Sequence, residues 1–236
     1  MNIKAIEELK SINDEKRLSN IEKAKAQGAV IPVRDGVIIG DGVQIEEGVV
    51  ILKGTILLGN TSVGADTVVG PDSLLYNMKV GRGNHLNAVQ GYEAEIKDNC
   101  DMGPFVHIRP NSVVSSRVHL GNFVEVKNSN VGEKTSVSHL TYIGDSDVGH
   151  NVNFGCGCVT VNYDGKNKHR TTVGNHCFIG CNTNLVAPVK VGDWSYTAAG
   201  STITEDVPEN SLGIGRARQV NKVNWVLKKK PYKETE

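Results

Sequence analysis

An apolar residue recurs at every sixth position along most of this 236-residue chain. The run from Ile39 to Val69 keeps this spacing unbroken, and after short irregular stretches it resumes and continues to Ile203. A period of six indicates a parallel β-helix, in which three short strands make one triangular coil and each coil stacks on the last. The chain is long enough to bury a substantial core in this way. The spacing therefore predicts an all-β coil over residues 29–225.

The two ends of the chain follow other patterns. Apolar residues from Ile3 to Ile21 recur near helical spacing among Lys and Glu, and Gly28 is a typical helix stop. We expect one amphipathic helix over residues 2–27, docked on the coil or on a partner, which makes residues 1–28 a helical arm. Residues 226–236 are charged, and we expect a disordered tail there.

The overall charge excludes some classes of partner. Twenty-six basic residues balance 26 acidic ones, so no net field favours nucleic acid or an anionic membrane. The sequence has no long apolar run, so we expect neither a signal peptide nor a transmembrane helix, and a cytoplasmic protein. Five cysteines without paired Cys-x-x-Cys spacing predict reduced thiols rather than disulfides or a zinc site.

Stacking the six-residue repeats places candidate site residues in columns. Residues one coil apart should lie about 4.8 Å from each other. The columns predicted in this way are Pro104, Asn122, His139, Cys156, Cys181 and Ala199; Arg109 and Lys127; and His107, Glu125 and Tyr142. Two stacked cations repel each other unless an anion or carboxylate lies between them. Arg109 and Lys127 are therefore candidates for a phosphate site, and the alternative is that both extend into solvent.

The column through His139 has two interpretations as well. A histidine of this kind is a structural hydrogen-bonding residue or, beside a bound substrate, the natural proton acceptor. Cys156, Cys181 and Ala199 continue the column as a narrow groove that suits a long thin ligand. The seven histidines do not share one column, so we predict no metal site within a chain, and ligands shared between subunits stay open.

Several longer motifs resemble one known family. They are Gly103-Pro-Phe-Val-His-Ile-Arg-Pro, Gly121-Asn-Phe-Val-Glu-Val-Lys, Ser138-His-Leu-Thr-Tyr-Ile-Gly-Asp, Val161-Asn-Tyr-Asp-Gly-Lys-Asn-Lys, Leu185-Val-Ala-Pro-Val, Ala198-Ala-Gly-Ser-Thr-Ile-Thr and Arg216-Ala-Arg-Gln. The chain is similar, over about residues 10–225, to the acetyltransferase domain of the bifunctional N-acetylglucosamine-1-phosphate uridyltransferase/glucosamine-1-phosphate N-acetyltransferase. This is a hexapeptide-repeat acyltransferase family.

The resemblance implies a left-handed parallel β-helix, a homotrimer and acetyl-CoA-dependent N-acetylation of glucosamine 1-phosphate, a step toward UDP-N-acetylglucosamine and peptidoglycan. It implies that His139 is the general base. We expect Glu125 to orient the His139 ring by fixing its tautomer. Implied sugar-phosphate contacts are Arg109, Lys127, Tyr142, Asn153 and Lys168. Implied acetyl-CoA contacts are Cys156, Asn162, Tyr163, Cys181, Ala199 and Arg216, with Lys222 near the CoA phosphates.

The chain departs from the family pattern in two ways. No doubly wound pattern with a glycine-rich nucleotide loop precedes the helix, so we expect no uridyltransferase activity; a separate uridyltransferase partner stays open. Cys156 and Cys181 stand where the family usually has Ala or Gly and Ser, which weakens a hydroxyl contact. The alternatives are an acetyltransferase for another amino sugar, nucleotide-linked or not, and a partner subunit without catalysis.

Overall fold

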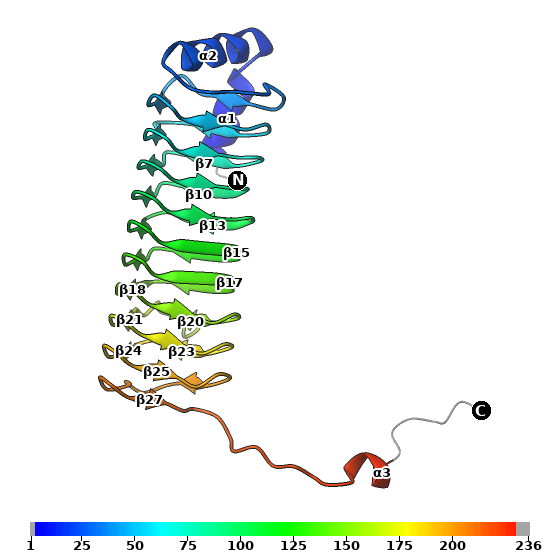
Figure 1. Cartoon of the computed structure of the whole chain (residues 1–236), viewed down its shortest axis with the longest axis vertical. Helices are drawn as coiled ribbons and strands as arrows, with labels where there is room; N and C mark the ends of the chain where they lie inside the picture. The colour runs from blue at the N-terminus through cyan, green and yellow to red at the C-terminus, as the bar shows by residue number, and fades with distance from the viewer. Residues whose placement is uncertain (1–2, 230–236) are drawn as a thin grey trace, which may run out of the picture.

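The chain forms a tall three-sided coil of short parallel strands (Figure 1), and the computed structural model describes residues 3–229 of it. Ile39 lies beside Leu57, and Leu57 lies beside Leu75, so three hexads complete one coil. Because the apolar residue of each hexad points inward, the stacked coils share one continuous core. The predicted left-handed parallel β-helix with an N-terminal helix is confirmed.

Three faces run along the coil, and each consists of parallel strands. The first face contains β1 (Ile38–Ile39), β4 (Ile56–Leu58), β7 (Leu74–Tyr76), β10 (Val89–Tyr92), β13 (Val106–Ile108), β20 (Val159–Val161), β23 (Asn184–Val186) and β26 (Thr202–Ile203). The second face contains β2 (Gln44–Ile45), β5 (Ser62–Val63), β8 (Lys79–Val80), β11 (Glu95–Ile96), β14 (Val113–Val114), β16 (Asn130–Val131), β18 (Ser146–Val148), β21 (Thr171–Val173) and β24 (Val189–Val191). The third face contains β3 (Val50–Ile51), β6 (Val68–Val69), β9 (His85–Leu86), β12 (Asp101–Met102), β19 (Asn153–Phe154), β22 (Phe178–Ile179), β25 (Tyr196–Thr197) and β27 (Leu212–Gly213). The longer strands β15 (His119–Lys127) and β17 (Ser136–Gly144) turn the corner from the third face to the first.

Large apolar residues occupy the corner between the third and first faces. Phe105, Phe123 and Leu140 have φ angles of 64°, 60° and 42° and are 60%, 55% and 60% exposed. The rings of Phe105 and Phe123 stack with centroids 5.4 Å apart. Bulky residues rarely adopt this left-handed conformation, and their exposure shows that they do not serve the core of their own coil. They mark this corner as a surface with another purpose.

The N-terminal arm consists of two helices, so the prediction of one helix over residues 2–27 is wrong. Helix α1 (Ile3–Ser11) ends before Asn13, whose side chain caps α2 (Asp14–Ala26) by accepting from the Lys16 backbone N–H at 2.9 Å. The cap ends one helix and begins the next, although the apolar spacing continues across it. Helix α2 covers the first coil, and α1 packs along the first face against β4. None of the helices in residues 3–229 is long and apolar enough to cross a membrane.

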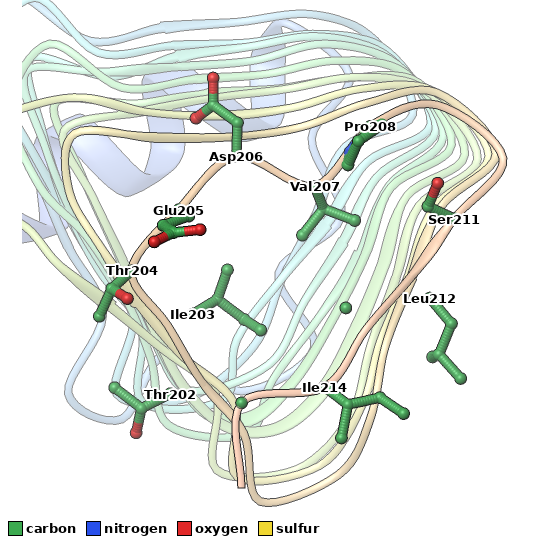
Figure 2. Close-up of a pocket in the computed structure, with 12 residues that line it drawn as sticks. Thr202, Ile203, Thr204, Glu205, Asp206, Val207, Pro208, Ser211, Leu212 and Ile214 are labelled. Carbon is green, nitrogen blue, oxygen red and sulfur yellow. The ribbon is translucent and has the colours of Figure 1, made fainter.

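The coil ends at β27, earlier than the predicted boundary at residue 225. Seen along the coil, Ile203 and Val207 of the last coil point to its middle, and Leu212 and Ile214 point outward (Figure 2). They border an open hollow of about 250 Å³. The following strap leaves the coil and contains the short helix α3 (Trp225–Lys229), which overlaps the predicted tail (Figure 1). Residues 230–236 of that tail lie outside the described residues.

Candidate active site

Three cationic side chains meet at the corner between the first and second faces. Arg109 follows β13, Lys127 ends β15 and Lys168 lies in the loop after β20. They line one hollow of about 330 Å³ together with Pro110, Asn111, Asn128 and Asp145, which we call the cationic hollow. Lys127 and Lys168 line the same hollow, and the neighbouring Lys127 ammonium lowers the pKa of Lys168. Adjacent ammonium groups of this kind attract an anion.

Asp145 is the buried carboxylate of the cationic hollow, and several side chains donate to it. Its side chain is only 5% exposed and lies 2.8 Å from Lys127 Nζ. Asn128 donates to the other carboxylate oxygen at 2.5 Å, and Asn162 also donates to Asp145. Burial alone would raise the pKa of Asp145, but these hydrogen bonds outweigh it and hold the pKa below its usual value. Asp145 was not among the predicted site residues, although it is the last residue of the motif Ser138-His-Leu-Thr-Tyr-Ile-Gly-Asp.

Lys127 and Arg109 therefore each have a carboxylate partner within the chain. Burial disfavours the Lys127 ammonium, yet the bond to Asp145 outweighs this and raises the pKa of Lys127. Arg109 donates from Nη1 to Glu125 Oε1 at 2.9 Å. The prediction that Glu125 fixes the tautomer of His139 is wrong for this chain, because Glu125 pairs with Arg109 and another residue contacts the His139 ring.

Tyr142 joins the cationic hollow to the first face. The predicted column is confirmed, since Glu125 lies beside His107 on one side and beside Tyr142 on the other. The Tyr142 ring lies over Gly144, where any side chain would come within 2.2 Å of the phenol oxygen. Asn162 donates to that oxygen at 3.4 Å. Asn162, which the resemblance names as an acetyl-CoA contact, is buried and joins Tyr142 to Asp145 beside the cationic hollow.

His139 lies at the opposite edge of the first face, on the corner shared with the third face. Its Nδ1 is 2.8 Å from Asn122 Oδ1, and the two residues are direct neighbours on β17 and β15. Because an amide oxygen only accepts, this contact requires the ring proton on Nδ1 and leaves Nε2 able to take a proton. The ring is exposed, so Nε2 is accessible to a substrate. Asn122 is therefore the residue that orients the imidazole.

The predicted column continues from His139 toward the C-terminal end. The strand register places Phe154 beside Ile179 and Ile179 beside Thr197, two residues before each position of the column. Cys156, Cys181 and Ala199 therefore lie in one exposed line on successive coils, as predicted.

Arg216 lies near the C-terminal end of this column. A side chain built at Gly200 would lie 3.9 Å from Arg216 Cδ, so this residue borders the last position of the column. Cys158, by contrast, points into the core, and burial raises the pKa of its thiol to about 11.

The resemblance also names Asn153, Tyr163 and Lys222, and of these Tyr163 is paired through the backbone with Lys168 of the cationic hollow. Asn153 is on the third face beside Ser136. Tyr163 is 56% exposed in the loop after β20, where its hydroxyl donates to the Gly165 carbonyl at 2.7 Å. Lys222 is in the strap beyond the coil. One chain therefore presents two clusters of predicted site residues on either edge of the first face, the cationic hollow and the column through His139.

Two of the seven histidines share a column. His85 and His119 lie on either side of Asp101, and each Nδ1 lies 3.1 Å from a different oxygen of that carboxylate. Within residues 3–229 no three His, Cys, Asp or Glu side chains gather as a set of metal ligands.

Comparisons with known proteins agree with this architecture. Residues 170–205 match the bacterial transferase hexapeptide (six repeats) model, and residues 27–53 match the hexapeptide repeat of succinyl-transferase. Among curated relatives, the bifunctional protein GlmU of Caldicellulosiruptor saccharolyticus is 56% identical over 158 residues, 67% of this chain and 34% of the relative. GlmU of Clostridium kluyveri is 61% identical over 137 residues, 58% of this chain and 30% of the relative.

The chain thus spans about a third of the length of these relatives. A UDP-N-acetylglucosamine acyltransferase structure from Francisella novicida aligns with a TM-score of 0.47 at 13% identity, covering 87% of this chain and 75% of that one.

Proposed function

We propose that this hexapeptide-repeat chain, a homologue of about a third of GlmU, transfers an acetyl group from acetyl-CoA to the amine of glucosamine 1-phosphate. One observation carries the proposal: the cationic hollow and His139 lie at opposite edges of one face, with Tyr142 between them. A phosphate at one edge would leave the sugar lying across the face toward the base. A cationic site that binds phosphate and a base that accepts a proton from an amine together suit an amino-sugar phosphate.

The cationic hollow supplies the anchor. Lys127 and Lys168 line the same hollow, and Arg109 adds a planar fork suited to two phosphate oxygens. Asp145 and Glu125 offset part of this positive charge and keep the cations in place when the hollow holds no phosphate. A bound phosphate then replaces hydration of the amines rather than creating a new arrangement.

His139 supplies the proton acceptor. In the proposed reaction the substrate amine attacks the thioester carbon, His139 Nε2 takes the amine proton, and the tetrahedral intermediate expels the CoA thiolate. Asn122 holds the ring in the required tautomer. Backbone N–H groups near Cys156 are the candidate donors to the oxyanion. Positioning the two substrates together supplies much of the rate gain.

Acetyl-CoA is proposed to lie along Cys156, Cys181 and Ala199, with Arg216 and Lys222 toward its phosphates. An acetyl-CoA donor agrees with a cytoplasmic enzyme. The side chains of Cys156 and Cys181 are small and exposed, so a thin ligand could lie along them.

We further propose that a homotrimer completes the site. Asn153 lies on the third face and Lys222 lies in the strap, so neighbouring subunits would have to bring such residues to the site. The exposed Phe105 and Phe123 beside the His139 corner supply apolar surface for such a contact.

The test is an acetyl-CoA assay that follows release of free thiol. Glucosamine 1-phosphate should be acetylated, and glucosamine without the phosphate should react far more slowly. A UDP-linked amino sugar that reacts faster than the 1-phosphate would identify a different substrate. No turnover with any amino sugar would favour the hypothesis of a non-catalytic partner subunit.

A further inference from the structure

The loop that carries Lys168 is an insertion in the coil. β20 and β23 are direct neighbours, yet the chain between Thr160 and Leu185 is longer than in other coils because residues 162–170 leave the coil and return. The tip of this loop is closed by Asp164, which accepts from the backbone N–H groups of Lys166 at 2.8 Å and Asn167 at 2.6 Å. His169 Nε2 lies 2.8 Å from the same carboxylate. These contacts shape the loop but do not attach it to the coil.

Two residues attach the loop to the coil: Asn162 at its start, which donates to Asp145, and Arg170 at its end. Arg170 Nε and Nη2 donate to the two carboxylate oxygens of Asp147 at 2.9 and 2.7 Å, and its Nη1 donates to the Asn128 carbonyl at 3.1 Å. Asp147 is itself fixed by Asn130, which donates to it at 2.7 Å. Asn128 lines the cationic hollow and donates to Asp145, so the guanidinium joins the loop directly to the wall of the hollow.

We propose that Arg170 is a positioning residue that holds Lys168 in the cationic hollow. The expected effect on kinetics rests on the proposed function. The expected effect on the loop rests only on the contacts of Arg170. Simple exposed ion pairs contribute little, but a bidentate fork with a third hydrogen bond fixes both distance and direction. Lysine cannot replace it, because an ammonium is a single point charge and cannot bind both Asp147 oxygens and Asn128 in one plane.

The kinetic test compares Arg170→Lys and Arg170→Gln with a matched control. Arg117 pairs with Glu133 across neighbouring coils at another corner, and both pairs are about half exposed. Both Arg170 variants should raise the KM for glucosamine 1-phosphate about tenfold, with kcat within about threefold and the KM for acetyl-CoA unchanged. Arg117→Gln should change none of these constants. An Arg170→Lys enzyme equal to the parent, or an Arg117→Gln enzyme with the same rise in KM, would overturn the proposal.

Amide hydrogen exchange tests the same role without any substrate. In Arg170→Gln and in Asp147→Asn, amides 164–169 should exchange about tenfold faster or more, while the flanking strands β20 and β21 keep their protection. Unchanged exchange in this loop would show that other contacts hold it. If the parent protein does not acetylate glucosamine 1-phosphate, the proposed function fails, and the exchange data still decide whether Arg170 anchors the loop.

Discussion

Replacing Asp145 by Asn should destabilise the coil markedly, because it leaves the largely buried Lys127 ammonium without its carboxylate partner. Breaking a fully buried pair by removing one partner costs about 3 to 5 kcal/mol. The Lys127 side chain retains 15% of its exposure and faces a hollow that admits water, so hydration recovers part of this loss. We therefore expect a decrease of about 2 to 3 kcal/mol in the free energy of unfolding near pH 7.

The pH dependence follows from the direction of both shifts. The pKa of Asp145 is lowered by folding, so its contribution is present above the unfolded value near 3.9 and is lost as pH falls through the folded pKa. The pKa of Lys127 is raised, so its contribution is complete below about 10.4 and is lost as pH rises through the folded pKa. The difference in unfolding free energy between parent and variant should be constant from about pH 5 to 9 and should decrease in acid.

Urea unfolding measures this difference in free energy. All samples are kept at one protein concentration, so that subunit association does not change the apparent stability. Lys127→Met and the double variant complete a double-mutant cycle. The double variant should be more stable than the sum of the single losses predicts, because it removes both buried charges together. A loss below about 0.5 kcal/mol for Asp145→Asn, or strict additivity in the cycle, would refute the reasoning.

Three further outcomes are expected. His139→Ala should lower kcat about 100-fold or more while the unfolding transition is unchanged, which steady-state kinetics and circular dichroism can check. Lys168→Ala should raise the KM for glucosamine 1-phosphate roughly tenfold and leave the slow reaction of phosphate-free glucosamine unaffected; an equal effect on both would make Lys168 a structural residue. Acetyl-CoA should slow alkylation of Cys156 and Cys181, measured by mass spectrometry of labelled peptides, whereas Cys158 should stay unreactive with or without it because burial raises its pKa to about 11.

The parts of the fold that repeat could be predicted from the sequence. The six-residue spacing located the coil, and stacking the repeats brought Cys156 and Cys181 to neighbouring positions, as well as Glu125 and Tyr142. These predictions succeed because a solenoid turns sequence separation into a fixed spatial register.

Features that depend on single side-chain contacts could not be predicted in this way. Asn162 reaches Asp145 only because an insertion begins after β20, and no repeat rule gives the path of an insertion. The choice of Glu125 between Arg109 and His139 depends on which way its side chain turns at the corner. The break between α1 and α2 depends on the Asn13 cap, a local signal that the longer apolar pattern outweighed in the sequence analysis.

The two ends of the coil have unequal protection, and this bears on donor binding. Helix α2 covers the first coil, but the strap after β27 leaves the last coil with an open hollow (Figure 1 and Figure 2). Since each coil contacts only its neighbours, local opening should start at the C-terminal coils and travel toward the middle. Ala199 and Arg216 lie in that part, so the distal half of the proposed acetyl-CoA groove belongs to the segment that opens most readily. Binding of acetyl-CoA there would then stabilise the C-terminal coils against local unfolding.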